Sequence, residues 1–91
     1  MQIDLTPIAD IIPYTKNAKE HPPKQIKKIA DSIAAFGFNQ PVVIDANRVI
    51  IVGHGRYLAA QLLGMATAPT LTLDLDEEHA RAYRLADNRL N

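Results

Sequence analysis

The chain has 91 residues, 47% of them hydrophobic and 22% charged, and its ten basic side chains balance ten acidic ones. This length suits one small domain with a modest core. No apolar run approaches the roughly 20 residues of a membrane-spanning helix, and the first residues do not form a signal-peptide pattern. The absence of cysteine excludes thiol chemistry, and the zero net charge argues against a domain that holds DNA by its overall field.

The first third of the chain predicts a short strand, a surface loop and a helix. Residues 3–5 suit an edge strand, and Thr6-Pro7 suits the start of a turn or a single helical turn. Residues 15–23 carry lysines, an asparagine and two prolines, which is the composition of a surface loop. An amphipathic pattern then predicts a helix over residues 24–36 that ends at Gly37.

The middle of the chain predicts a β-hairpin. Residues 42–44 and 49–52 are β-branched runs joined by a short turn sequence, so the sheet is expected to be at least partly antiparallel. Residues 68–75 alternate as a half-buried strand would, with Thr70 and Thr72 facing outward. Together with a helix over residues 76–90, these elements predict a small α+β domain in which about three helices pack against a mixed sheet.

The last predicted helix has a cap and two distinct faces. Asp74 or Asp76 can cap it. Arg81 and Arg84 share one face with Asn88. We interpret this face as solvent-exposed, with contact to phosphate as the alternative. The other face is predicted to be apolar and comprises Ala82, Tyr83, Ala86 and Leu90.

The chemistry gathers where the strand over residues 49–52 meets a helix predicted over residues 56–63. Gly53 and Gly55 supply a turn, and such a turn leaves backbone N–H groups free at the positive end of the helix dipole, which favours an anion. Arg56 adds a five-donor guanidinium where the dipole alone disfavours a cation. We therefore predict an anion against the N–H groups of Gly55, Arg56 and Tyr57. The alternative is that the glycines only make a turn and that Arg56 is solvated.

Several motifs, spread over nearly the whole chain, carry a family resemblance. They are Asn17-Ala18-Lys19, Ala30-Asp31-Ser32-Ile33, Gln40-Pro41-Val42-Val43, Gly53-His54-Gly55-Arg56-Tyr57 and Asp87-Asn88-Arg89. Their order and spacing resemble the ParB N-terminal domain family, whose members are also labelled ParB-like nuclease domains. The resemblance implies the fold shared with sulfiredoxin. It also implies binding of a nucleoside triphosphate with Mg²⁺, which is CTP in the partition proteins and ATP in sulfiredoxin.

The resemblance also implies roles for individual residues. The turn that grips the phosphates corresponds to Gly53, His54, Gly55 and Arg56. The segment near the base and sugar corresponds to Ser32, Gly37, Gln40 and Pro41. Asp87 and Asn88 correspond to the acid and amide that assist Mg²⁺ and hydrolysis, so they are the implied metal-binding and catalytic residues.

The chain departs from the partition proteins at several places, one of which is Asn17-Ala18-Lys19 in place of their Asn-Pro-Arg. These proteins carry Gly-Glu-Arg-Arg at the turn, so His54 replaces an acid and Gly55 replaces an arginine. Asp87 replaces a glutamate that is one methylene longer. We therefore predict binding that exceeds catalysis, with slow NTP hydrolysis or none. Because the chain has no cysteine, the reductase chemistry of sulfiredoxin is excluded.

The turn and the Asp87-Asn88-Arg89 motif look most like ParB-like domains of phage and mobile-element proteins that are joined to a DNA adenine methyltransferase. This implies a cytoplasmic, bacterial or phage-encoded protein. Residues 1–91 would then be one domain of a longer protein that reaches DNA through other segments and forms a homodimer.

Three functions stay open at this point. They are a nucleotide-binding regulatory module, a DNA-contacting or nuclease domain, and an interaction module of the methyltransferase. The sequence does not set the base of the nucleotide. A metal site built from His21, His54 and His79 is a further alternative, although none of the three shares a usual ligand spacing with another.

Overall fold

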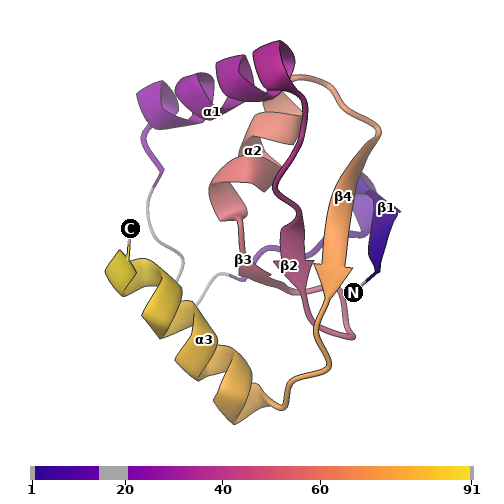
Figure 1. Cartoon of the computed structure of the whole chain (residues 1–91), viewed down its shortest axis with the longest axis vertical. Helices are drawn as coiled ribbons and strands as arrows, with labels where there is room; N and C mark the ends of the chain where they lie inside the picture. Colours follow the sequence, from indigo (N-terminus) through magenta and orange to yellow (C-terminus); the bar gives the residue numbers. More distant parts are fainter. Residues whose placement is uncertain (1, 15–20, 91) are drawn as a thin grey trace.

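The sheet is mixed and has its shortest strands in the middle and at one edge. The structure is a computed structural model that describes residues 2–14 and 21–90, with side chains up to Asp87. Within these residues, four strands lie in the order β1 (Ile3–Pro7), β4 (Thr67–Thr72), β2 (Val42–Ile44), β3 (Ile50–Val52). β2 runs parallel to β4, and the other neighbouring pairs are antiparallel (Figure 1). The predicted hairpin and the mixed sheet are confirmed.

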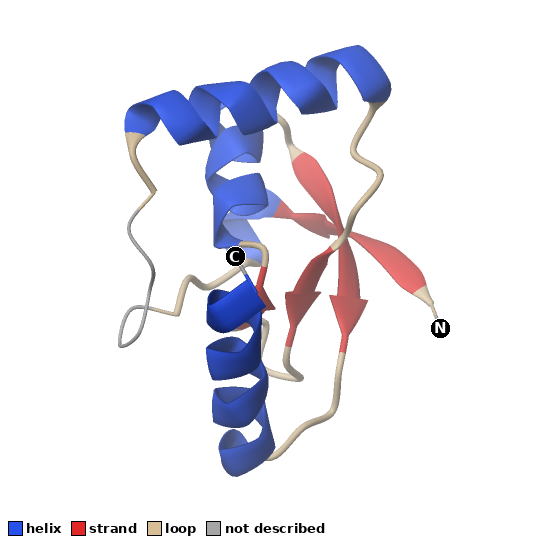
Figure 2. Cartoon of the chain, turned by 60° about the vertical axis from the view of Figure 1, so that its left-hand side comes forward, coloured by secondary structure: helices blue, strands red, loops and turns tan. Residues whose placement is uncertain are grey.

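Helices cover both faces of this sheet. In the described part of the chain these are α1 (Pro23–Phe36), α2 (His54–Leu62) and α3 (Glu77–Leu90), besides a short 3-10 helix, η1 (Ile8–Asp10). α1 lies across the end of α2 (Figure 2), and α3 packs against the face of β2 opposite α2. The predicted α+β class is confirmed. None of the described helices is long and apolar enough to cross a membrane.

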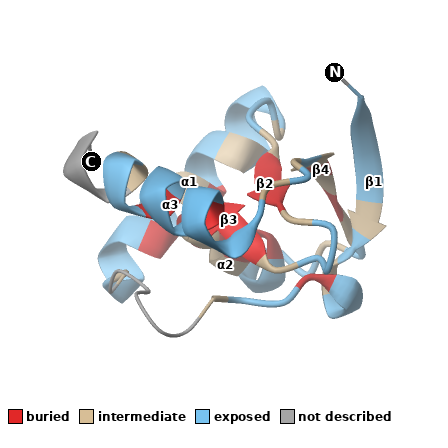
Figure 3. Ribbon diagram, turned by 90° about the horizontal axis from the view of Figure 1, so that it is seen from below, coloured by how far each residue is buried: buried red, intermediate tan, exposed pale blue. Residues whose placement is uncertain are grey.

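Two apolar clusters lie on opposite faces of β2. Val42 and Ile44 pack with Tyr57 of α2, whereas Val43 packs with Ala80 of α3. Every residue of β2 and β3 is buried, as expected for unbroken β-branched runs (Figure 3). β3 is an edge strand, and its burial on both faces depends on α3 covering one of them.

The predicted outward position of Thr70 is wrong. Its side chain is 0% exposed, and its hydroxyl is 2.7 Å from that of Thr6. Thr70 lies on β4, which is central in the sheet, and the alternation therefore places it on the covered face next to Ala68. A buried threonine is tolerated here because the hydroxyl has a partner on the neighbouring strand β1.

The start of α2 also differs from the prediction. Gly53 adopts a left-handed conformation, with φ 104°, and forms the N-cap, so the helix begins at His54 rather than at Arg56. Gly55 therefore lies inside the first helical turn, not before it. The start of α3 follows the expected capping chemistry, because Oδ1 of Asp76 accepts a hydrogen bond from the N–H of His79 at 2.8 Å.

Candidate functional site

The turn between β3 and α2 needs glycine at its first position. A Cβ on Gly53 would lie 3.0 Å from Nη2 of Arg56 and 3.3 Å from Cα of Val42, and its positive φ disfavours other residues. No side chain caps the helix. The N–H groups of His54, Gly55 and Arg56 therefore have no acceptor inside the helix, which leaves donors and the positive dipole end facing outward.

The Tyr57 N–H is not among these donors. It donates to the carbonyl oxygen of Gly53 at 3.0 Å, as the first intrahelical bond of α2. The predicted contact of this N–H with an anion is therefore wrong. The Tyr57 side chain is buried as well, and its hydroxyl accepts a hydrogen bond from Nε2 of Gln61 at 3.0 Å. Its role is to pack α2 onto the sheet.

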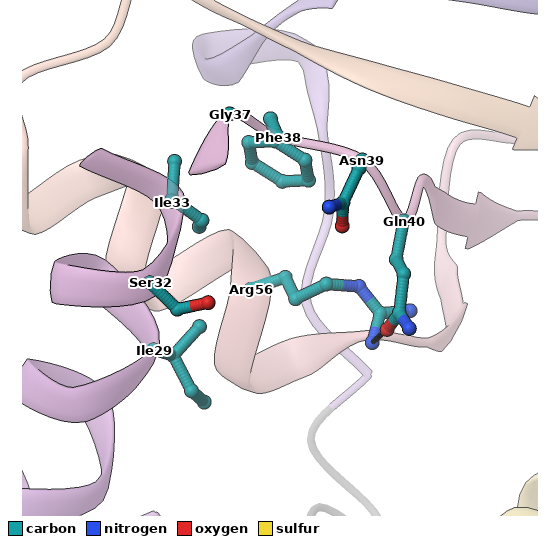
Figure 4. Close-up of a pocket in the computed structure, with 8 residues that line it drawn as sticks. All are labelled: Ile29, Ser32, Ile33, Gly37, Phe38, Asn39, Gln40 and Arg56. Atoms are coloured by element: carbon teal, nitrogen blue, oxygen red, sulfur yellow. Dashed lines mark hydrogen bonds between the residues drawn. The ribbon is translucent and has the colours of Figure 1, made fainter. Parts of the chain in front are cut away.

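Arg56 is half-buried and tied to the segment that follows α1. Its Nη2 donates to the carbonyl oxygen of Pro41 at 3.0 Å. Nη1 lies 3.5 Å from Oε1 of Gln40, and Figure 4 shows these two side chains next to each other. Its Nε is buried and has no hydrogen-bond partner among the described residues. Burial lowers the pKa of Arg56, and the charge of Asp87 raises it. The alternative that Arg56 is solvated is wrong.

A pocket of about 250 Å³ lies between α1, the segment after it and Arg56 (Figure 4). Its wall combines apolar and polar side chains and is formed by Ile29, Ser32, Ile33, Gly37, Phe38, Asn39, Gln40 and Arg56. Three of the four residues expected near a base and sugar, Ser32, Gly37 and Gln40, therefore line one pocket together with the arginine of the turn. Pro41 contributes through its carbonyl oxygen, which holds Arg56.

Gly55 lets α1 and the segment before it approach the start of α2. A Cβ at this position would lie 2.8 Å from Cδ1 of Ile29 and 3.4 Å from the ring of His21. Nδ1 of His21 is buried and has no hydrogen-bond partner among the residues described. A role of His21 near an anion site could not be predicted, because nothing in the spacing of the two residues connects it with Gly55.

His54 is held by a backbone donor from a distant segment. The N–H of Tyr14 donates to Nε2 of His54 at 3.1 Å. Burial lowers the pKa of His54, and electrostatic interactions with His21 and Arg84 lower it further, while the hydrogen bond from Tyr14 and the charge of Asp87 act in the opposite direction. The lowered pKa favours the neutral form of the His54 ring.

The prediction that Arg84 is solvent-exposed is wrong. Its side chain is 7% exposed, and Nε and Nη2 donate to the carbonyl oxygen of Ile50 at 3.1 and 3.0 Å. The guanidinium carbon lies 3.7 Å from the centre of the Tyr14 ring, as in a cation–π contact. The predicted apolar face is wrong too, because Tyr83 is 41% exposed and α3 instead buries Ala80 and Arg84.

Asp87 lies one turn after Arg84 and within electrostatic reach of the turn, since its charge raises the pKa of both Arg56 and His54. Asn88 belongs to α3, but its side chain is outside the described part, as is the Asn17-Ala18-Lys19 motif.

Nδ1 of His79 lies 2.7 Å from Oδ1 of Asp76 at the start of α3. Among the described residues, no group of three or more His, Cys, Asp or Glu could hold a metal ion.

Comparison with known proteins identifies the family. Residues 2–89 match the family described as the ParB N-terminal domain. The chain belongs to this family. The ParB-like nuclease domain-containing protein YnaK of Escherichia coli (strain K12) is 37% identical over 83 residues, which cover 89% of this chain and 95% of that protein. The probable chromosome 2-partitioning protein ParB of Deinococcus radiodurans is 37% identical over 68 residues, which cover 71% of this chain and only 23% of that protein.

Solved structures confirm the fold expected of a ParB N-terminal domain. The chromosome-partitioning protein ParB of Caulobacter crescentus, complexed with CTP-gamma-S, aligns with a TM-score of 0.86 at 20% identity, covering 100% of this chain and 54% of that chain. Sulfiredoxin of Arabidopsis thaliana aligns with a TM-score of 0.76 at 22% identity, covering 91% of this chain and 97% of that one. The fold shared by ParB and sulfiredoxin is thereby confirmed for this ParB N-terminal domain.

Proposed function

We propose that this chain is a nucleoside-triphosphate-binding module, for CTP or ATP, of a protein that acts on DNA. The observation that carries this proposal is the position of Arg56. It lines the pocket after α1 and also belongs to the first turn of α2, where unpaired N–H groups favour an anion. A ligand with an apolar, hydrogen-bonding end and a polyanionic end fits these two adjoining surfaces.

The pocket suits the base and sugar. Ile29, Ile33 and Phe38 offer apolar contact, and Ser32, Asn39 and Gln40 offer hydroxyl and amide groups. This combination of apolar wall and few polar groups is usual for small-molecule sites. At about 250 Å³ the pocket is small for such a site, so it would enclose only part of a nucleotide and leave the phosphates outside.

The first turn of α2 suits the phosphates. The N–H groups of Gly55 and Arg56 point out of the helix, and the guanidinium of Arg56 is already fixed by Pro41. A guanidinium fixed before the ligand arrives loses less conformational freedom on binding than a mobile one. His54 adds a ring nitrogen at the same end of the helix.

Mg²⁺ fits this arrangement if the nucleotide supplies most of its ligands. Mg²⁺ is commonly held by one or two carboxylates together with phosphate oxygens and water. Asp87 would be the carboxylate, since its charge raises the pKa of both Arg56 and His54. Asn88, the next residue on α3, would be the amide of the pair.

The relatives support a role in DNA partition, and a role in DNA modification is the alternative. The Deinococcus relative is a probable chromosome-partitioning protein, and the solved Caulobacter protein was complexed with a CTP analogue. We infer that this domain regulates a cytoplasmic, bacterial or phage-encoded protein, that DNA is bound through other segments, and that two copies associate. The proposal includes a link to a DNA methyltransferase. The full-length coding sequence tests this link, because it would show whether the same protein carries methyltransferase motifs.

Calorimetric titration with CTP, ATP, GTP and UTP, each with and without Mg²⁺, tests the proposal. We expect saturable binding of CTP or ATP, tighter than binding of inorganic tripolyphosphate, because the base adds contacts in the pocket. Arg81→Ala, which removes an exposed arginine from α3, should leave the affinity unchanged. Absence of binding for all four nucleotides at millimolar concentration would contradict the proposal.

A further inference from the structure

Arg84 is a buried cation that the proposed nucleotide site does not use. It lies on the inner side of α3, whose outer side is exposed (Figure 3). Burying a guanidinium costs desolvation energy, which its hydrogen bonds to the Ile50 carbonyl and its contact with the Tyr14 ring must offset. The contacts of Arg84 therefore indicate which segments it holds in place.

Two successive contacts connect Arg84 with the start of α2. The guanidinium of Arg84 is anchored on the Ile50 carbonyl of β3 and lies against the Tyr14 ring. The N–H of the same Tyr14 donates to Nε2 of His54. The segment that carries Tyr14 is thus held between α3 and the first residue of α2.

The bond from Tyr14 determines which nitrogen of His54 carries the proton. Because Tyr14 donates, Nε2 must offer a lone pair, and a neutral ring then carries its proton on Nδ1. The ring therefore has one N–H donor and no positive charge. An uncharged donor suits this end of a helix, where the dipole disfavours a cation.

We propose that Arg84 is a positioning residue of the anion site: by fixing Tyr14 it holds His54 in the Nδ1–H tautomer, which donates to a phosphate oxygen at the start of α2. This inference rests on the proposed nucleotide binding for its last step only. The lowered pKa of His54 agrees with a ring that stays neutral when the site is empty.

Nitrogen-15 NMR of the imidazole rings, recorded at pH 7.5 without nucleotide, tests the tautomer directly. We expect His54 of the wild-type protein to show the Nδ1–H form. Arg84→Met should shift it to a mixture with the Nε2–H form, and Arg84→Lys should restore the wild-type signal in part, because an ammonium can still donate to the Ile50 carbonyl. Arg81→Met, on the exposed side of α3, is the matched control and should change nothing.

Titration with CTP and with inorganic tripolyphosphate, both in the presence of Mg²⁺, tests the consequence. Arg84→Met should bind both ligands about fivefold more weakly, the loss expected for one neutral hydrogen bond. If the wild-type protein binds neither ligand, the proposed function fails. The NMR measurement of the His54 tautomer then still shows whether Arg84 positions His54. If the protein binds but Arg84→Met keeps both the tautomer and the affinity, the role of Arg84 is refuted while nucleotide binding stands.

A second variant covers the case in which Arg84→Met does not fold. Tyr14→Leu keeps the backbone N–H and leaves Arg84 on the Ile50 carbonyl, but removes the ring that the guanidinium holds. We expect the same mixture of His54 tautomers in this variant. A pure Nδ1–H signal in Tyr14→Leu would overturn the inference, because Tyr14 would then hold His54 without help from Arg84.

Discussion

The guanidinium of Arg56 donates a hydrogen bond to the carbonyl oxygen of Pro41 across 3.0 Å, and this single contact joins the first turn of α2 to the segment that follows α1. The pocket and the helix start therefore act as one surface. Nε of Arg56 is buried and has no hydrogen-bond partner among the described residues.

Arg56→Ala is expected to weaken triphosphate binding by about 1.5–3 kcal/mol, the usual worth of a charge-assisted hydrogen bond. Calorimetric titration with the best-bound nucleotide measures the change. Arg81→Ala controls for the loss of one positive charge and should bind like the wild-type protein. An unchanged affinity in Arg56→Ala would limit this arginine to holding the Pro41 segment.

Gly55→Ala is expected to destabilise the fold by about 1–3 kcal/mol, as overpacking commonly does. The added Cβ would lie 2.8 Å from Cδ1 of Ile29. Urea denaturation measures the loss. The cost should largely disappear in the Ile29→Ala background, where the clash is absent and alanine favours the helix over glycine. An equal cost in both backgrounds would place the constraint in the backbone of the turn and not in the contact with α1.

The strands and helices could be predicted because local patterns decide them. The β-branched runs at β2 and β3 are too short and too apolar for anything but buried strands, and the prolines before α1 and Asp76 before α3 mark helix starts. The buried face of α3 could not be predicted, because hydrophobic periodicity predicts that an arginine is solvent-exposed. Arg84 is buried only because the Ile50 carbonyl and the Tyr14 ring, both distant in sequence, receive it.

The candidate site shows the same division. The glycine turn and Arg56 were visible in a few consecutive residues, and the family resemblance named Ser32, Gly37 and Gln40, which line one pocket. The contacts of His21 with Gly55 and of Tyr14 with His54 were not visible. Each of these contacts joins segments whose approach depends on how α1 and α2 pack, and no local pattern encodes it.

Protein stability is expected to fall as the pH drops below about 6.5, in part because of His54. The unfolded histidine titrates near 6.5, while burial lowers the pKa of His54 in the folded protein. Between these two pKa values the unfolded chain binds more protons, so stability rises with pH in this window and the effect is complete above 6.5.

Urea denaturation at pH 5.0, 6.0 and 7.5 measures this dependence. His54→Gln should flatten the decline, since glutamine does not titrate. His79→Gln, which removes an exposed histidine near the start of α3, should keep most of it. A decline that is the same in His54→Gln as in the wild-type protein would assign the pH dependence to other groups.

Asp87 is expected to contribute the Mg²⁺-dependent part of nucleotide affinity and little turnover. Its charge raises the pKa of both Arg56 and His54, which is the observation that connects this carboxylate with the start of α2. The family resemblance implies a glutamate, one methylene longer, at this position of the partition proteins, so Asp87 is expected to reach less far toward a metal or a water. Asp87→Ala should therefore lose the gain in affinity that Mg²⁺ confers while keeping the affinity measured without Mg²⁺, and Arg56→Ala should weaken both.

Phosphate release measured over hours should stay near background in the wild-type protein, because positioning a metal is less demanding than orienting an attacking water. Asp87→Glu restores the missing length and is expected to raise that release. Turnover well above background that disappears in Asp87→Ala would instead make the domain an NTPase in its own right.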